Sequence, residues 1–99
     1  MPDYKLAPEA EADLDRLFDF GIDTFGLDQA VKYIQGLEER FDDIANNPLM
    51  YPAVDHIRQG YRRSVYGVHS IYYRMKSEHV DIMRLIHHED ILHKLKADM

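Results

Sequence analysis

The sequence has no cysteine, and it has no apolar run long enough to cross a membrane. The absence of cysteine excludes disulfides, thiolate metal ligands and cysteine nucleophiles, and it suits a reducing compartment. The first eleven residues, M-P-D-Y-K-L-A-P-E-A-E, lack the apolar segment of a signal peptide. A membrane helix needs about 18 apolar residues or more, and no segment approaches that length. We therefore expect a soluble, cytoplasmic protein.

Positive charge is also scarce, and it is unevenly distributed along the chain. The 99 residues hold 12 Lys/Arg against 18 Asp/Glu, which gives a net charge of −6. Residues 1–55 hold 4 Lys/Arg and 13 Asp/Glu, whereas residues 56–99 hold 8 Lys/Arg, 5 Asp/Glu and all six histidines. An acidic total argues against direct, sequence-specific nucleic-acid binding by this chain alone. The length fits a single domain over residues 1–99.

Motifs for nucleotide, metal and nucleophilic chemistry are missing as well. The five glycines are scattered, so no phosphate-binding loop is formed, and no Ser-His-Asp pattern stands out. The segment H-H-E-D-I-L-H (87–93) resembles a metal motif, but His88 and His93 would lie about 140° apart around a helix. The acidic pairs at 38–39 and 42–43 have the pattern of a solvated helix face. We expect neither a metal nor a cofactor.

Two amphipathic helices are predicted in the first half, after a short β-compatible stretch at residues 3–6. The first helix begins at Pro8, where a proline is well tolerated, and ends at Gly26. Its apolar residues recur at helical spacing: Leu14, Leu17, Phe18, Ile22 and Phe25. The second helix covers about 28–45 and has a similar stripe. The connection is short, so the helices form an antiparallel hairpin whose shared stripe needs another apolar surface to cover it.

Alternation with a period of two predicts three strands in the second half, after a loop bounded by Pro48 and Gly60. The strands cover residues 61–66, 69–75 and 80–86, and a short helix is expected at 89–96. The fold class is therefore α+β in the order β-α-α-β-β-β-α, with the helical hairpin packed on one face of an antiparallel sheet. The opposite face of the sheet would be free for function.

Four arginines and one histidine on these strands are candidates for binding a partner: Arg62, Arg63, Arg74, Arg84 and His87. Alternation forbids all of them from sharing one face, although several can. It also places Arg84 on the same face as Ile82 and Ile86. The guanidinium groups either bind carboxylates, phosphates or rings of a partner, or pair with Asp81, Glu78 and the acidic helices. The spacing alone leaves both possibilities open.

Six motifs, taken in order and with their spacing, resemble a known family: A-x-x-D-L (10–14), F-G-x-x-Q-A (25–30), L-x-x-x-F-x-x-I-A-x-N-P (37–48), G-Y-R-R (60–63), H-S-I-Y-Y-R (69–74) and D-I-M-R-L-I-H (81–87). Together they resemble the ParE toxins of the RelE/ParE superfamily, from about residue 4 to residue 95. The resemblance implies a bacterial type II toxin with a β-α-α-β-β-β fold and a ParD-like antitoxin that wraps around it.

The resemblance leaves two activities to compare. ParE-like toxins poison DNA gyrase and are not enzymes, whereas RelE-like relatives use the same fold to cut mRNA on the ribosome. RNA cleavage without a metal needs an acid, a base and cations, and Arg62 or Arg63, Arg84 and His87 could imitate such a set. An acidic chain would be repelled by ribosomal RNA. Gyrase poisoning is therefore the preferred function, and mRNA cleavage is the alternative.

The resemblance also implies two binding surfaces. Gyrase would meet the cationic residues of the sheet, namely Arg62, Arg63, Arg74, Arg84 and His87. The antitoxin would occupy an apolar groove beside the helical hairpin. The residues expected to form that groove are Leu14, Leu17, Phe18, Tyr33, Leu37, Tyr72 and Tyr73.

Overall fold

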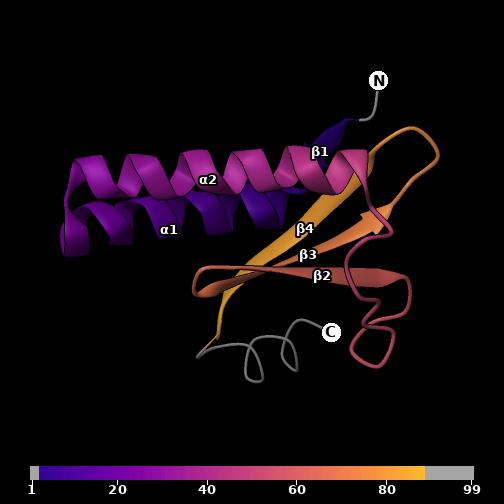
Figure 1. Cartoon of the computed structure of the whole chain (residues 1–99). Helices are drawn as coiled ribbons and strands as arrows, with labels where there is room; N and C mark the ends of the chain where they lie inside the picture. The colour runs from indigo at the N-terminus through magenta and orange to yellow at the C-terminus, as the bar shows by residue number, and fades with distance from the viewer. Residues whose placement is uncertain (1–2, 89–99) are drawn as a thin grey trace.

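The computed structural model describes residues 3–88, and its elements follow the predicted order (Figure 1). They are β1 (Tyr4–Leu6), α1 (Pro8–Phe25), α2 (Leu27–Asn46), β2 (Tyr61–Tyr66), β3 (His69–Met75) and β4 (Val80–His87). The α+β class and the β-α-α-β-β-β order are confirmed. The helix expected at 89–96 lies outside the described residues.

Local sequence explains where the two helices begin and end. Pro8 lies in the first turn of α1, where its missing N–H leaves no hydrogen bond unmade, and Glu9 and Glu11 lie where the helix dipole favours negative charge. Gly26 separates the helices with a φ of +92°, a conformation that glycine adopts without strain. The helices approach each other closely at Gly21, where an added Cβ would lie only 3.2 Å from the Ala30 Cβ.

The strands form one sheet in the order β1-β4-β3-β2. β2, β3 and β4 make an antiparallel meander, as predicted, with Arg63 opposite Tyr72 and Ser70 opposite Ile86. β1 departs from the expected antiparallel pattern, because it pairs in parallel with the first part of β4. A parallel pair needs a long crossover, and here α1, α2, β2 and β3 lie between β1 and β4 in the sequence.

A β-bulge in β4 changes which of its residues share a face. The pairing of β3 with β4 shifts register so that Met83 is left without an opposite residue. Leu85 consequently joins Ile82 in the core beneath the helices, whereas Ile86 packs in a separate cluster. The prediction that Ile82, Arg84 and Ile86 share one face is therefore wrong, because strict alternation ends at the bulge.

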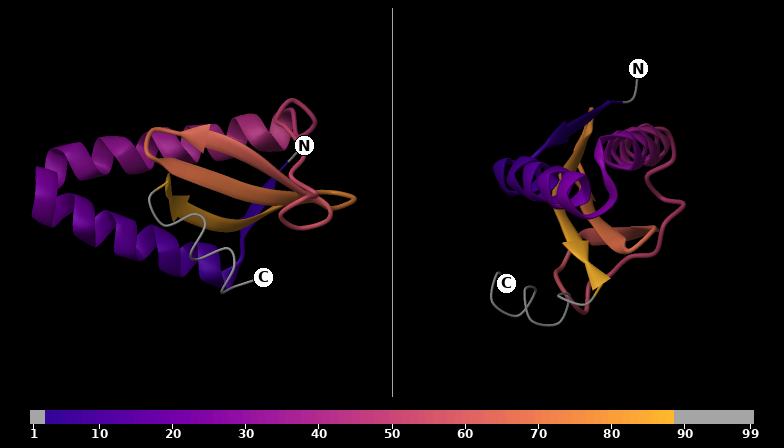
Figure 2. Two further views of the ribbon diagram at one scale, coloured as in Figure 1. Left: turned by 90° about the horizontal axis from the view of Figure 1, so that it is seen from below. Right: turned by 90° about the vertical axis from the view of Figure 1, so that its left-hand side faces the viewer.

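The main core lies between the helices and one face of the sheet (Figure 2). Its largest fully buried side chains are Leu37, Phe41, Ile44, Ile71, Tyr73 and Ile82. A smaller cluster lies on the opposite face, where Val54 and Ile57 of the connecting loop pack with Tyr61, Tyr72 and Ile86. The prediction that the opposite face is free is therefore only partly correct, because this loop covers part of that face.

Both helices extend beyond the sheet at the end that carries the α1–α2 turn (Figures 1 and 2). We call residues 18–32 the overhang, because Leu17 and Tyr33 on either side of this segment still pack against the main core. No helix in the described part of the chain is both long and apolar enough to cross a membrane.

Candidate partner-binding surfaces

Asp13 on α1 holds β4 through its buried carboxylate. Arg84 donates to both carboxylate oxygens, at 2.8 Å from Nε and 3.2 Å from a terminal nitrogen, and the Leu85 backbone N–H donates at 2.9 Å. Arg16 adds a contact of 2.6 Å from an exposed position. The side chains of Asp13 and Arg84 are 4% and 15% exposed. The strand position of Arg84 had suggested that it is presented to a target. The structure instead engages its side chain inside the fold.

The other three arginines predicted to bind the target lie in surroundings that differ from one another. Arg62 donates to the backbone oxygen of Tyr51 at 2.7 Å. Arg74 forms an ion pair with Asp81 at 3.4 Å and remains partly exposed. Arg63 lies on the sheet face that points away from the helices, and within residues 3–88 its guanidinium has no hydrogen bond or ion pair. The structure therefore does not gather these arginines into one cluster.

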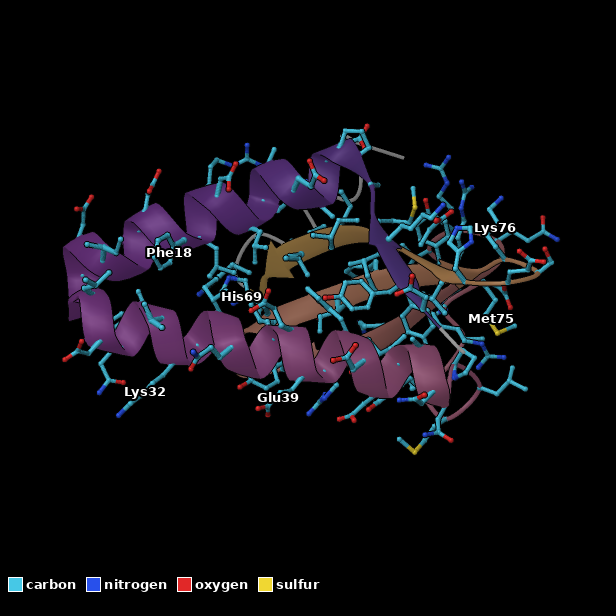
Figure 3. The ribbon with its side chains drawn as sticks, turned by 90° about the horizontal axis from the view of Figure 1, so that it is seen from above. Phe18, Lys32, Glu39, His69, Met75 and Lys76 are labelled. Atoms are coloured by element: carbon cyan, nitrogen blue, oxygen red, sulfur yellow. The ribbon has the colours of Figure 1, made fainter. Side chains whose placement is uncertain are left out.

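A polar aromatic cluster joins α2 to the sheet beside the overhang. The Tyr33 hydroxyl oxygen is 2.8 Å from His69 Nδ1 and 3.0 Å from the Tyr66 carbonyl oxygen. Because a carbonyl only accepts, all three groups are satisfied when Tyr33 donates to Tyr66 and neutral His69 donates from Nδ1. His87 packs edge-on against His69, with ring centroids 5.3 Å apart. Figure 3 shows His69 beneath the helices, far from Lys76 at the other end of the sheet.

The burial of His69 predicts a pH-dependent loss of stability. Burial lowers the pKa of His69 from 6.5 to about 4, and His87 and His88 add to this shift while Asp13 opposes it. As the pH falls from 6.5 towards 4, the unfolded chain takes up a proton at His69 before the folded chain does. The contribution of His69 to stability is therefore complete above that window and is lost through it. Allowing for partial exposure, we expect a loss of about 2 kcal/mol.

Urea unfolding at several pH values measures this effect. His69→Gln cannot titrate, so its stability should fall less than that of the wild type over the same window. His56→Gln is the matched control, because His56 is exposed. Equal pH dependence in the wild type and His69→Gln would show that His69 is not the group responsible.

Arg40 closes the outer edge of β2. Its guanidinium donates to Ser64 Oγ and to the Val65 carbonyl oxygen, each at 2.8 Å, and lies 5.2 Å from the Tyr66 ring centroid. Gly36 leaves room for this arrangement, because a Cβ there would collide with the Tyr66 hydroxyl. The loop before β2 pairs with the start of the same strand. These contacts protect the β2 edge against pairing with another strand.

The overhang exposes three large apolar side chains. Phe20, Phe25 and Leu27 are 64%, 68% and 57% exposed. Phe20 lies on the same side of α1 as Asp13 and Leu17, which face the sheet, and Leu27 continues the core-facing stripe of α2. Both stripes therefore continue past the end of the sheet that covers them, which is the pattern of a docking surface.

The residues expected to bind the antitoxin fall into two groups. Four are partly buried and lie in or beside the overhang: Leu14, Leu17, Phe18 and Tyr33. Three are 0% exposed and belong to the core: Leu37, Tyr72 and Tyr73. The second group cannot meet a partner in this conformation, so its assignment to a surface is corrected here. The sequence prediction did not include Phe20 and Leu27, which the structure leaves exposed, although their place at the ends of the two apolar stripes was a signal for them.

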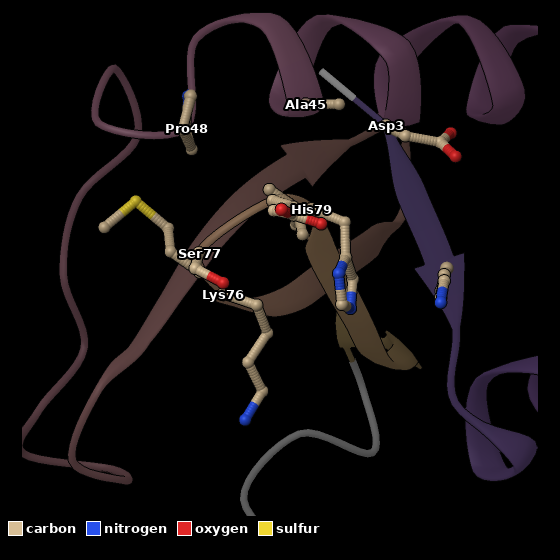
Figure 4. Close-up of a pocket in the computed structure, with 10 residues that line it drawn as sticks. Asp3, Ala45, Pro48, Lys76, Ser77 and His79 are labelled. Carbon is tan, nitrogen blue, oxygen red and sulfur yellow. The ribbon is translucent and has the colours of Figure 1, made fainter. Parts of the chain in front are cut away.

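An open hollow of about 720 Å³ lies where the β3–β4 turn, the start of β1 and the end of α2 meet (Figure 4). Its charged lining is mixed, with Lys5 and Lys76 set against Asp3 and Glu78. This mixture gives no uniform charge to select a ligand. Among residues 3–88, no three metal-binding side chains converge.

Comparison with known proteins decides the family. Residues 4–92 match the family described as the ParE toxin of the type II toxin–antitoxin system parDE. This chain belongs to the ParE toxin family. Its ParE relatives include Toxin ParE1 of Mycobacterium tuberculosis, 39% identical over 85 residues that cover 85% of this chain and 87% of the relative. Toxin ParE1 of Caulobacter vibrioides is 34% identical over 87 residues, covering 88% and 90%.

Solved structures show the same fold. A chain of the chromosomal ParDE toxin–antitoxin system from P. aeruginosa has a TM-score of 0.75 and 22% identity, covering 88% of this ParE chain and 96% of that chain. A chain of the RelBE2 toxin–antitoxin complex from Mycobacterium tuberculosis has a TM-score of 0.60 and 21% identity, covering 88% and 99%. The predicted RelE/ParE-like fold is confirmed.

Proposed function

We propose that this ParE toxin poisons DNA gyrase and so blocks replication, and that a ParD-like antitoxin neutralises it. Membership of the family of type II toxins supports the proposal, together with relatives named Toxin ParE1 in two bacteria. In this role the toxin acts in the cytoplasm, where gyrase works, and it stabilises the plasmid or chromosome that encodes the pair.

The observation that favours binding over RNA cleavage is the scattering of the cationic residues. Arg84 is held by Asp13, and Arg62 is held by a backbone carbonyl. Arg63 lies on the sheet face away from the helices, whereas His87 packs beside His69 on the helix-facing side. Cleavage needs its acid, base and cations around one phosphate. We therefore propose that this toxin makes and breaks no bond itself and acts as an inhibitor.

The distribution of charge favours a protein target over a nucleic acid. The two helices, residues 8–46, hold 11 Asp/Glu and 3 Lys/Arg. Residues 47–88, which include β2, β3 and β4, hold 3 Asp/Glu and 6 Lys/Arg. An acidic layer on one side weakens attraction to nucleic acid, while the cationic sheet side can still meet an acidic patch on a protein. Arg63 and Arg74 are the predicted target residues that remain accessible to such a patch.

We place the antitoxin on the overhang. The apolar stripes that pass beyond the sheet, ending at Phe20 and Leu27, suit the apolar face of an amphipathic helix. Leu17, Phe18 and Tyr33 border the same surface. The β2 edge is closed by Arg40 and the preceding loop, so addition of a partner strand there is disfavoured.

Assays of the purified toxin with gyrase and with ribosomes test the proposed activity. Loss of plasmid supercoiling with trapped, broken plasmid and intact mRNA is the expected result. Cut mRNA with unaffected gyrase would overturn the proposal and establish the alternative, a RelE-like mRNA interferase.

Replacing Arg63 and Arg74 together tests the proposed target surface. The double variant Arg63→Ala/Arg74→Ala should need at least about tenfold more toxin for the same inhibition of supercoiling, because two contacts to the target are removed. Lys32→Ala is the control, since Lys32 is an exposed cation of the acidic helical layer. Unchanged inhibition by the double variant would remove these two arginines from the target surface.

A further inference from the structure

The overhang carries unbalanced negative charge beside its exposed apolar side chains. Residues 18–32 hold three aspartates, Asp19, Asp23 and Asp28, and one cation, Lys32. All four side chains are exposed. Figure 3 shows Lys32 directed away from α1, the helix that carries Asp19 and Asp23. A partner that covers the apolar side chains therefore also meets a negatively charged surface.

Asp19 and Asp23 occupy positions that are unfavourable in the isolated toxin. They are four residues apart on α1, so their like charges are neighbours on the helix surface, and Asp15 extends the same row. Asp23 also lies in the last turn of α1, where the helix dipole is negative and no basic residue is present. Within residues 3–88, neither Asp19 nor Asp23 makes an ion pair or a side-chain hydrogen bond. The charge of these two carboxylates is thus left uncompensated.

These carboxylates border the apolar part of the overhang. Asp23 follows Phe20 by three residues on α1, a spacing at which side chains are neighbours on a helix surface. Phe20, Phe25 and Leu27 are each more than half exposed. An apolar face with a charged border is complementary to an amphipathic helix, which carries polar residues beside its apolar stripe. The sign of the border decides which charge those polar residues need.

We propose that the overhang binds an amphipathic helix whose apolar stripe is flanked by lysine or arginine residues, and that these cations pair with Asp19 and Asp23. The inference rests on the proposed function, because it specifies the chemistry of the antitoxin helix. Cations at this place offset the repulsion between the two carboxylates and the negative end of the α1 dipole at the same time. They also speed association, because opposite charges attract before contact is made.

The same charges disfavour three other occupants of the overhang. A second copy of this chain would bring two acidic overhangs together, and like charges that face each other across an interface are costly. Membranes that contain anionic lipids, and helices with acidic flanks, are repelled for the same reason. A cationic amphipathic helix matches both the apolar and the charged part of the surface.

Two synthetic peptides test the sign of the charge. They form the same leucine stripe on helices of equal length and differ only in the flanking residues, which are lysine in one peptide and glutamate in the other. Fluorescence anisotropy at low ionic strength should show that the lysine peptide binds the full-length toxin at least about tenfold more tightly. Equal or tighter binding of the glutamate peptide, or no binding of either peptide, would overturn the proposal.

Neutral variants of the carboxylates test the position of the cationic contacts. Asp19→Asn/Asp23→Asn should weaken binding of the lysine peptide by at least about fivefold. Asp42→Asn/Asp43→Asn is the matched control, because it removes two exposed carboxylates near the C-terminal end of α2. The control should change the affinity by less than about twofold. Equal losses in both double variants would show attraction to the net charge of the chain rather than to the overhang, and the proposal would be wrong.

Thermal unfolding gives a second readout that needs no partner. Asp19→Asn/Asp23→Asn should leave Tm unchanged or raise it, because it removes a like-charge pair and a negative charge at a helix C-terminus. A fall in Tm of more than about 4 °C would show that the two carboxylates stabilise the toxin itself, which contradicts the proposal.

Sedimentation of the free toxin tests the competing occupant. The toxin should be a monomer, and a dimer that Phe20→Glu/Leu27→Glu abolishes would assign the overhang to a second copy instead. None of these measurements uses gyrase or ribosomes. Failure of the peptide experiments would therefore leave the proposed activity in place, and failure of the gyrase assay would leave the chemistry of the overhang in place.

Discussion

Asp13→Ala is expected to lower the free energy of unfolding by about 3–5 kcal/mol. The substitution leaves the Arg84 guanidinium, which is 15% exposed, without its carboxylate, and it leaves the Leu85 N–H without its acceptor. Breaking a buried ion pair on one side is costly, because the remaining charge loses the opposite charge that offset its lost hydration. For a domain of this size, the change corresponds to a fall in Tm of more than about 10 °C. Thermal or urea unfolding measures it.

The exposed partner of Asp13 offers a matched control. Arg16 contacts the same carboxylate at 2.6 Å, but its side chain is 64% exposed, so Arg16→Ala should cost about 1 kcal/mol or less. The double variant Asp13→Leu/Arg84→Met should recover much of the loss, because apolar side chains of similar size can replace a buried ion pair. A loss below about 1 kcal/mol for Asp13→Ala would show that this pair does not hold α1 to β4.

Glutamate at both Phe20 and Leu27 is expected to weaken binding of the proposed antitoxin by at least about a hundredfold. Each side chain would be an apolar anchor in the complex, and loss of one such anchor costs about 2 kcal/mol. Both side chains are more than half exposed, at 64% and 57%, so the folded toxin itself should keep its Tm. Titration of the purified toxin with its antitoxin measures the change, and co-expression should show toxicity that the antitoxin no longer relieves.

The opposite end of the molecule provides the control for this experiment. Leu49 and Met50 are 67% and 64% exposed and follow α2 rather than the overhang. Glutamates at both positions add the same charge and remove a similar apolar area, yet they should leave the affinity within about threefold of the wild type. A similar loss of affinity in the two double variants would mean that charge, and not the overhang, governs binding.

Much of the fold was predictable, because the signals that set it are local. The helical spacing of Leu14, Leu17 and Phe18 depends only on neighbours in the chain, and so does the freedom of Gly26 to end a helix. The predicted order of elements was accordingly confirmed. The parallel pairing of β1 with β4 was not predicted, because it joins segments far apart in the sequence.

The candidate sites were predicted less well than the fold. Alternation identified Arg84 as a sheet residue, but it could not show that Asp13, 71 residues away, engages its side chain. It also could not show that the bulge at Met83 places Ile86 on the face opposite Ile82. Tyr72 and Tyr73 looked like surface residues because the sequence does not show which parts of a sheet are covered.

The sequence by itself determined the family, the helices and strands, and the separation of acidic and basic halves, because each of these can be read from residue types and their spacing. Only the tertiary structure decided which of the charged and apolar groups remain available for partners. Availability depends on where the sheet ends beneath the helices and on which buried charge finds a partner from a distant segment. Phe20 and Leu27 stay exposed for the first reason, and Arg84 is engaged within the fold for the second.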